Sequence, residues 1–133
     1  MLTRRDAIAS TPLLLLLQAA GSAQPAPRGP IFQQELPNLN LDDWQVTVSE
    51  IVQAPGQAGR PHRHPGFVLV YVVDGELVTK VSGQAETAYK AGQVFWEAPG
   101  STHEVSRNPS DSKPVKFVAF IFAKKGLQLT TPA

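Results

Sequence analysis

Apolar and polar side chains alternate in short runs along most of the chain after residue 40. In residues 44–52 the apolar positions Trp44, Val46 and Val48 recur with a period of two, which predicts a half-buried strand. Further runs of strand character lie at 67–73, 76–81, 84–89, 94–97, 103–107 and 115–122. Asp74-Gly75 is typical of a two-residue hairpin and predicts that the runs beside it pair. No helical period follows residue 23, so we expect an all-β chain with a closed or sandwiched antiparallel sheet.

The first residues form a different pattern. Arg4 and Arg5 precede an apolar run that ends in small residues, which predicts a signal peptide at 1–23. The run is shorter than the roughly 20 residues that span a bilayer, so no stable membrane span is expected. The paired arginines also resemble a twin-arginine export signal, and the sequence leaves that route and the general secretory route open. We therefore expect a periplasmic or secreted protein.

A proline-rich stretch separates this signal from the folded part. We expect an extended linker and N-terminal arm at 24–40, one barrel domain at 41–124, and a C-terminal tail at 125–133. The 12 Lys and Arg residues nearly balance the 11 Asp and Glu residues, so nucleic acid is not an expected partner. The chain has no cysteine, which excludes disulfides, thiol nucleophiles and cysteine-ligated metals.

The three histidines have a spacing suited to one metal ion. His62 and His64 point to the same face if their segment is extended, and Pro61 and Pro65 disfavour a helix there. His103, on a later predicted strand, could supply a third nitrogen and leave open positions for water or substrate. The alternative is a solvated His-Arg-His loop and an unrelated surface histidine.

The glycine and histidine positions resemble the two motifs of the cupin family. The first motif, G-x5-H-x-H-x3,4-E-x6-G, is matched at Gly56, His62, His64 and Gly75, and the second, G-x5-P-x-G-x2-H-x3-N, at Gly92, Gly100 and His103. The resemblance implies a single-domain double-stranded β-helix barrel. It also implies one divalent transition metal (Fe, Mn, Ni, Cu, Co or Zn) held by His62, His64 and His103, and it permits dioxygenase chemistry.

Both motifs are incomplete. Val68 and Leu69 stand where the first motif has its glutamate, and Glu97 is the candidate for a substitute carboxylate. The alternative for Glu97 is a solvated charge at a strand end. In the second motif Ala98 replaces the proline, and Arg107 replaces the asparagine. Because strict alternation places Arg107 on the same side as His103, its guanidinium could contact a substrate anion inside the barrel; the alternative is a surface cation.

Three neutral imidazoles leave a divalent ion its full charge, which favours a small anionic substrate that chelates the metal. The leading hypothesis is therefore an exported metal-binding cupin with dioxygenase-like activity, whose catalytic residues the sequence does not assign. The alternatives are a metal-dependent isomerase or lyase, a non-catalytic protein that binds a metal or a small ligand, and a metal-free structural cupin. A small all-β domain has sheet edges to protect, so we also expect a homodimer.

Overall fold

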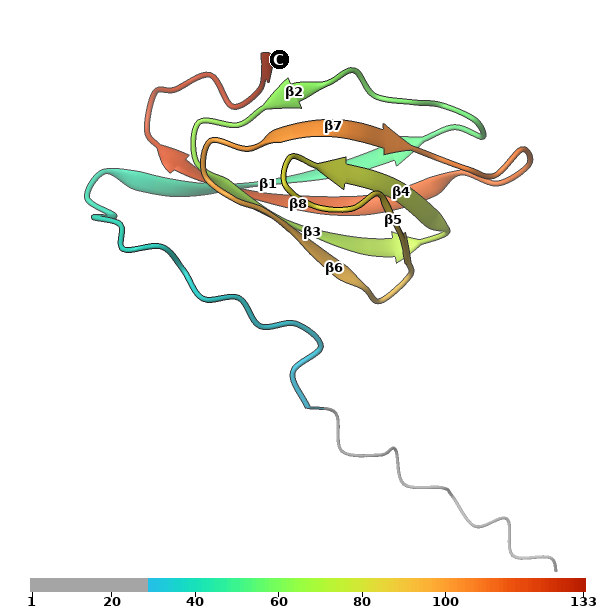
Figure 1. The fold of residues 1–133 in the computed structure, drawn as a ribbon, viewed down its shortest axis with the longest axis horizontal. Helices are drawn as coiled ribbons and strands as arrows, with labels where there is room; N and C mark the ends of the chain where they lie inside the picture. Colours follow the sequence, from blue (N-terminus) through green and yellow to red (C-terminus); the bar gives the residue numbers. More distant parts are fainter. Residues whose placement is uncertain (1–28) are drawn as a thin grey trace, which may run out of the picture.

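The computed structural model describes residues 29–133, and the signal peptide predicted at 1–23 lies outside the described residues. The described chain contains nine strands and no helix, so the all-β prediction is confirmed (Figure 1). None of the described residues belongs to a helix that could cross a membrane. The strands are Trp44–Gln53 (β1), His62–Arg63 (β2), Phe67–Asp74 (β3), Glu76–Val81 (β4), Thr87–Lys90 (β5), Val94–Glu97 (β6), Thr102–Arg107 (β7), Val115–Lys124 (β8) and Thr131–Pro132 (β9).

Two antiparallel sheets enclose the core. One has the strand order β1-β8-β3-β6 and the other the order β5-β4-β7-β2-β9. Consecutive strands often lie in different sheets, as Figure 1 shows for β6, β7 and β8. The apolar side chains that fill the space between the sheets come mainly from β3, β4, β6 and β8, and include Val68, Val70, Val72, Leu77, Phe95, Phe117 and Ile121. The last strand, β9, lies within the segment that the sequence assigned to a C-terminal tail, and it pairs with β2.

The predicted hairpin between β3 and β4 is wrong. β3 pairs with β6 and β8, whereas β4 pairs with β5 and β7 in the other sheet. Gly75 therefore lies at a corner between the two sheets. Its φ is 81°, a conformation that glycine adopts far more easily than residues with a side chain. A Cβ there would also lie 2.9 Å from the Pro114 carbonyl oxygen. A dipeptide that suits a tight hairpin turn serves equally well at a corner that turns the chain away from its own sheet.

The side of strand β1 that faces the interior is the opposite of the one that its apolar pattern suggested. Val46 and Val48 are 51% and 56% exposed, while the alternate positions, which include Ser49, Ile51 and Gln53, face the interior. An apolar set normally faces the core, because burial of apolar surface is favourable. Here the inner face of β1 borders a cavity rather than a close-packed core, and polar side chains line part of that cavity.

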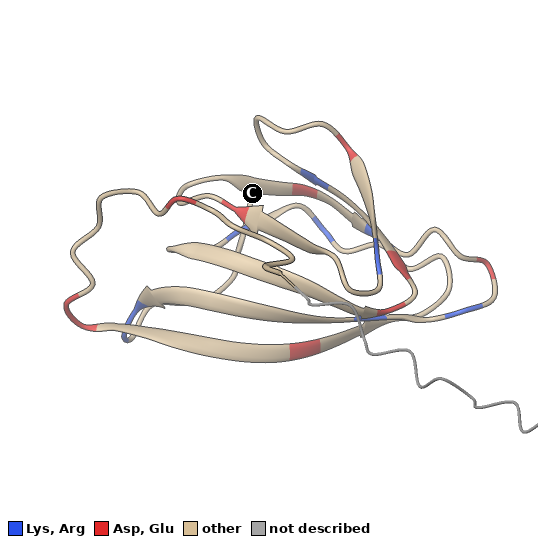
Figure 2. Ribbon diagram, turned by 90° about the horizontal axis from the view of Figure 1, so that it is seen from below, with Lys and Arg blue, Asp and Glu red and all other residues tan. Residues whose placement is uncertain are grey.

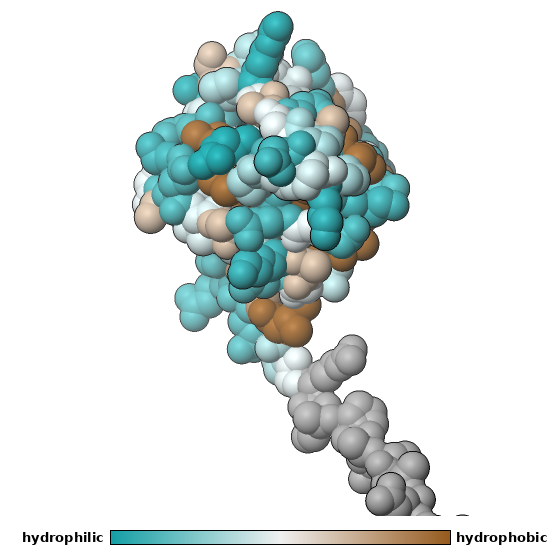
Figure 3. Space-filling view, turned by 90° about the vertical axis from the view of Figure 1, so that its right-hand side faces the viewer, coloured by the Kyte–Doolittle hydropathy of each residue, from teal (hydrophilic) through white to brown (hydrophobic). Residues whose placement is uncertain are grey.

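Over residues 29–133 the surface carries no concentration of one charge. In Figure 2 acidic and basic residues are interspersed along strands and loops, and in Figure 3 apolar residues of the visible face form separate patches among hydrophilic ones. This distribution agrees with the near-neutral composition and gives no support to a polyanion-binding face on the described residues.

Gly66 explains how the chain enters β3 directly after the histidine segment. A Cβ on Gly66 would lie 1.8 Å from the carbonyl oxygen of Phe122 and 3.0 Å from the Trp44 ring, so the backbones approach more closely than any side chain permits. Beside it, Phe67 stacks on Phe122 with ring centroids 4.8 Å apart. The glycine thus lets the start of β3 close onto the end of β8.

We predict that Gly66→Ala destabilises the fold by about 1–3 kcal/mol, the usual cost of forcing extra volume into a packed site. In a domain of this size that corresponds to a fall in Tm of several degrees, at roughly 4–8 °C per kcal/mol, measurable by thermal unfolding. Gly59→Ala is the matched control, because its Cβ would meet the nearest atom at 3.6 Å, an ordinary contact. Equal Tm values for the two variants would contradict the prediction.

Candidate functional site

The structure brings the three histidines together at one end of the space between the sheets. His62 on β2 lies directly opposite His103 on β7, and His64 follows two residues later. The ring of His62 is 4.9 Å from that of His64 and 5.0 Å from that of His103, measured between centroids. Histidines far apart in the sequence thus meet because β2 and β7 are neighbours in the five-stranded sheet.

Backbone carbonyls orient two of these rings. The Nδ1 atom of His62 is 2.8 Å from the Arg60 carbonyl oxygen, and that of His64 is 2.6 Å from the Leu129 carbonyl oxygen. A carbonyl can only accept, so each Nδ1 carries the hydrogen and Nε2 is the ring nitrogen left to face the cluster. This is the arrangement that fixes the tautomer and ring orientation of metal-binding histidines.

Burial lowers the pKa of His62 below its usual range, and the neighbouring His103 and His64 lower it further, against opposing effects of the Arg60 carbonyl and Glu97. The His62 imidazole is therefore neutral near pH 7. A neutral ring is the form that can bind a metal ion through Nε2.

Glu97, at the end of β6, is 4% exposed and faces the histidines. Its Oε1 atom lies 3.2 Å from His103 Nδ1, and its Oε2 atom lies 3.6 Å from His64 Nε2. Within residues 29–133 no lysine or arginine forms an ion pair with this carboxylate. Glu97 is also the direct cross-strand partner of Val68, so the two side chains share a face of the sheet. The carboxylate thus projects from the strand beside the position where the first motif has its glutamate.

His103 is engaged at both ring nitrogens. Its Nδ1 faces Glu97, and its Nε2 lies within hydrogen-bond distance of the Thr79 hydroxyl. Both ring nitrogens of His103 therefore have a polar neighbour within the protein. A second group that could hold one ion consists of His62, His64 and Glu97, whose ligand atoms all lie within 4.8 Å of one another. This set differs from the predicted set of three histidines, and it places His103 beside the carboxylate ligand.

The donor set is chemically suited to a divalent transition metal. With bonds of about 2.0–2.2 Å to nitrogen and oxygen, neighbouring ligand atoms around one ion lie about 3.0–3.6 Å apart. The three ligand atoms lie within 4.8 Å of one another, so binding an ion would draw them together by about 1–2 Å. The buried carboxylate has no lysine or arginine partner within residues 29–133, and a cation would supply a positive charge. Two imidazoles and one carboxylate would leave further positions open for water or substrate.

Arg107 lies on the outer side of the sheet. Its side chain is exposed and forms an ion pair with Glu86, at 3.1 Å between Nη2 and Oε1. The register between β4 and β7 shifts at Lys80 and Val81, which leaves Glu104 as an extra residue in β7. A bulge of this kind reverses the alternation of the residues beyond it. Strict alternation from His103 would place Arg107 on the inner side, and the bulge turns it to the outer side.

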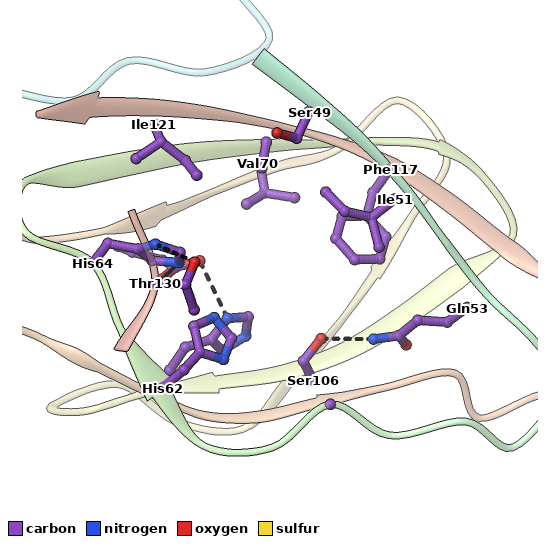
Figure 4. Close-up of a pocket in the computed structure, with 14 residues that line it drawn as sticks. Ser49, Ile51, Gln53, His62, His64, Val70, Ser106, Phe117, Ile121 and Thr130 are labelled. Atoms are coloured by element: carbon purple, nitrogen blue, oxygen red, sulfur yellow. Dashed lines mark hydrogen bonds and ion pairs between the residues drawn. The ribbon is translucent and has the colours of Figure 1, made fainter. Parts of the chain in front are cut away.

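A cavity of about 340 Å³ opens beside the cluster (Figure 4). Apolar side chains of β1, β3 and β8 form one part of its wall, namely Ile51, Val70, Phe117, Ala119 and Ile121. The polar lining includes Gln53, Ser106 and Thr130, none of which we singled out from the sequence. No sequence signal identifies Gln53, because the alternation in β1 predicts that its side of the strand faces solvent. No sequence signal placed Thr130, from the predicted tail, at the cavity.

The comparisons with known proteins agree with this geometry. The family model for the cupin domain matches residues 49–121. The β-alanine degradation protein BauB from Pseudomonas aeruginosa is 32% identical over 74 residues, which cover 54% of this chain and 78% of that protein.

Solved structures with the same fold include a protein with a double-stranded β-helix domain from Klebsiella pneumoniae, with 27% identity, a TM-score of 0.53, and coverage of 72% of this chain and 79% of that one. A DMSP lyase from Ruegeria pomeroyi has a TM-score of 0.57 at 14% identity, with 66% of this chain matching 43% of that one, and shows the fold alone. The expected double-stranded β-helix is therefore confirmed, and the chain belongs to the cupin family.

Proposed function

We propose that this chain is a metal-dependent cupin enzyme with dioxygenase-like activity toward a small anionic substrate that chelates the metal. The observation that carries the proposal is the buried Glu97 carboxylate, which faces His64 Nε2 and has no lysine or arginine partner within residues 29–133. Such a carboxylate is costly unless a cation compensates it.

The ligand set supports the choice of chemistry. Two histidines and one carboxylate with open positions form the donor set typical of non-haem Fe(II) oxygenases. When bound, the iron would supply redox chemistry toward oxygen and a positively charged point of attachment for the substrate anion. Because Glu97 contributes one negative charge, a divalent ion in this set keeps a net charge of about +1, which still favours an anion.

The protein groups around the centre would orient the ligands and exclude water. His103 Nδ1 lies 3.2 Å from Glu97 Oε1 and would help to fix the direction of the carboxylate, while Thr79 contacts the opposite side of the His103 ring. The apolar wall formed by β1, β3 and β8 would hold the body of the substrate away from solvent. A cavity of about 340 Å³ suits a small molecule. The name of the Pseudomonas aeruginosa relative concerns a small carboxylate, which supports the same substrate class.

We further propose that the domain is exported after cleavage near residue 23, with Arg4 and Arg5 directing the twin-arginine route. That route carries folded proteins, so the cell could insert the metal before export.

We predict that the protein, purified without a histidine tag or chelator, carries one metal ion per chain by mass spectrometry. His62→Ala, His64→Ala and Glu97→Gln should each abolish stoichiometric metal, because each removes a ligand atom. Arg107→Ala is the control and should retain the metal, since its side chain faces solvent. Full metal content in Glu97→Gln would contradict the proposed ligand set.

The role of His103 is tested in the same assay. His103→Ala should weaken metal affinity by about 10–100-fold, the usual effect of losing a group that orients a ligand. His103→Gln should lose less, because its amide can still donate to Glu97. Complete loss of metal in both variants would show that His103 binds the ion directly, as the sequence alone suggested.

We predict that the iron-loaded protein consumes oxygen with at least one member of a panel of small 2-oxo acids, 2-hydroxy acids and catechols. Uptake in an oxygen electrode should disappear in Glu97→Gln. Turnover without oxygen consumption would contradict the oxygenase assignment and indicate isomerase or lyase chemistry, and no turnover with metal bound would indicate a binding protein.

Replacement of Arg4-Arg5 by Lys-Lys should leave the uncleaved precursor in the cytoplasm, because that exchange blocks recognition of the arginine pair. Cell fractionation followed by immunoblotting measures this. Unchanged export would overturn the twin-arginine proposal.

A further inference from the structure

The four-stranded sheet is apolar on both of its faces. Val48 on β1, Phe120 on β8 and Leu69 on β3 lie side by side, because Val48 pairs with Phe120 and Phe120 pairs with Leu69. Val48 is 56% exposed, so this row of side chains points away from the core. An antiparallel sheet with one side in water normally places polar residues on that side. The outer side of this sheet departs from that pattern.

We define the outer sheet face by the outward positions of β1, β8 and β3, namely Val46, Val48, Val52, Val118, Phe120, Leu69, Tyr71 and Val73. Nine large apolar side chains of residues 29–133 are exposed, by 36% to 67%, and five of them lie on this face. Three more, Ile31, Leu36 and Leu41, lie on the arm that precedes β1. Exposed apolar side chains that gather on one side of a protein indicate an interaction site.

The arm of the same chain covers only part of this face. Phe32 lines a groove together with side chains of β3, β6 and β8, and Leu36 lines a neighbouring groove with Trp96 of β6. Val46 and Val48 on the β1 side stay exposed, and so do the apolar side chains of the arm itself. The arm therefore extends the apolar surface over β6 without closing it.

The size of this surface is suited to a second copy of the chain. Strands about 4.8 Å apart that rise about 3.3 Å per residue give four strand widths and about seven residues a flat area of about 19 Å by about 23 Å, or about 430 Å². Side chains that project from the sheet and the exposed arm add accessible area to this. Specific interfaces bury about 600–1,000 Å² on each partner, so the outer sheet face and the arm are large enough for the lower part of that range.

The charges on this surface also favour a second copy. Glu50 and Lys116 lie among the apolar side chains, and Lys116 Nζ is 3.3 Å from Glu50 Oε1, so the two charges neutralise each other. The pair offers no net charge that would attract a partner of opposite charge. A neutral apolar face of a sheet is complementary to an identical face, and a two-fold interface brings the same patch of two subunits together.

We propose that the outer sheet face and the arm form the interface of a two-fold homodimer, in which the same apolar surface of two chains packs together. The sequence predicts a homodimer only from the need to protect sheet edges, and β1 is such an edge. Val46 and Val48, whose pattern predicts burial, are then buried by the second chain and not by the core of their own. The interface does not depend on the proposed function, because Glu97 points to the inner face of the same sheet.

Sedimentation equilibrium of the purified protein over a wide range of concentrations tests the interface. The wild type should approach twice the mass of one chain as the concentration rises. Val48→Glu should raise the dissociation constant of the dimer by about 100-fold or more, because a charge without a partner is costly inside an apolar contact. Ala88→Glu adds the same charge at an exposed strand position of the other sheet and should leave the dissociation constant unchanged. A wild type that stays monomeric at every concentration, or an equal effect of the two substitutions, would overturn the proposal.

Introduced thiols provide a second readout that does not require the interface to be disrupted. The chain contains no cysteine, so Val48→Cys and Ala88→Cys each carry a single thiol. The rate of maleimide labelling of Val48→Cys should fall as the protein concentration rises, whereas that of Ala88→Cys should stay constant. Protection of Val48→Cys at every concentration would show that the chain covers this face with its own residues. Labelling of Val48→Cys that never slows would show that no second chain covers the face, and either result would overturn the proposal.

Discussion

A carboxylate inside a folded protein requires compensation, and at Glu97 only histidine nitrogens provide it among the described residues. The carboxylate lies between His103 Nδ1, beside one oxygen, and His64 Nε2, which faces the other. A carboxylate buried beside these nitrogens is stabilised only if a proton or a cation lies between them. The geometry of the cluster follows from this requirement, and so does its suitability for a divalent ion.

The two sheets contribute different parts of the centre. His62 and His103 come from β2 and β7 of the five-stranded sheet, whereas Glu97 comes from β6 of the four-stranded sheet. An ion bound by both would therefore link the sheets at one end of the barrel. Glu97 on β6 is the cross-strand partner of Val68 on β3, so the side chains of both residues point to the same face of the sheet.

Sequence reasoning was successful where it depended on local pattern. Alternation and turn residues placed most of the strands, and the prolines beside His62 and His64 predicted the extended segment that β2 confirms. It failed where pairing partners or a bulge decided the result. The Asp74-Gly75 turn looked like a hairpin, and both an interior and a surface position stayed open for Arg107 because the extra residue in β7 leaves no trace in the sequence.

The cavity lay beyond local reasoning for a related reason. Gln53 and Ser106 meet across 53 positions of sequence, and their contact depends on which face of β1 turns inward. The pattern of β1 predicted that the face with Val46 and Val48 would turn inward, because apolar residues are usually buried. A strand that borders a ligand cavity can reverse this preference, and only the assembled barrel shows that β1 does so.

The most direct measurement is a crystal structure of the protein loaded with Fe(II) under anaerobic conditions, with anomalous diffraction at the iron edge. We expect one anomalous peak about 2.0–2.3 Å from His62 Nε2, His64 Nε2 and a carboxylate oxygen of Glu97, with His103 still hydrogen-bonded to that carboxylate. An ion bound by His62, His64 and His103 with Glu97 turned away, or no peak at this cluster, would contradict the central role that we assign to Glu97.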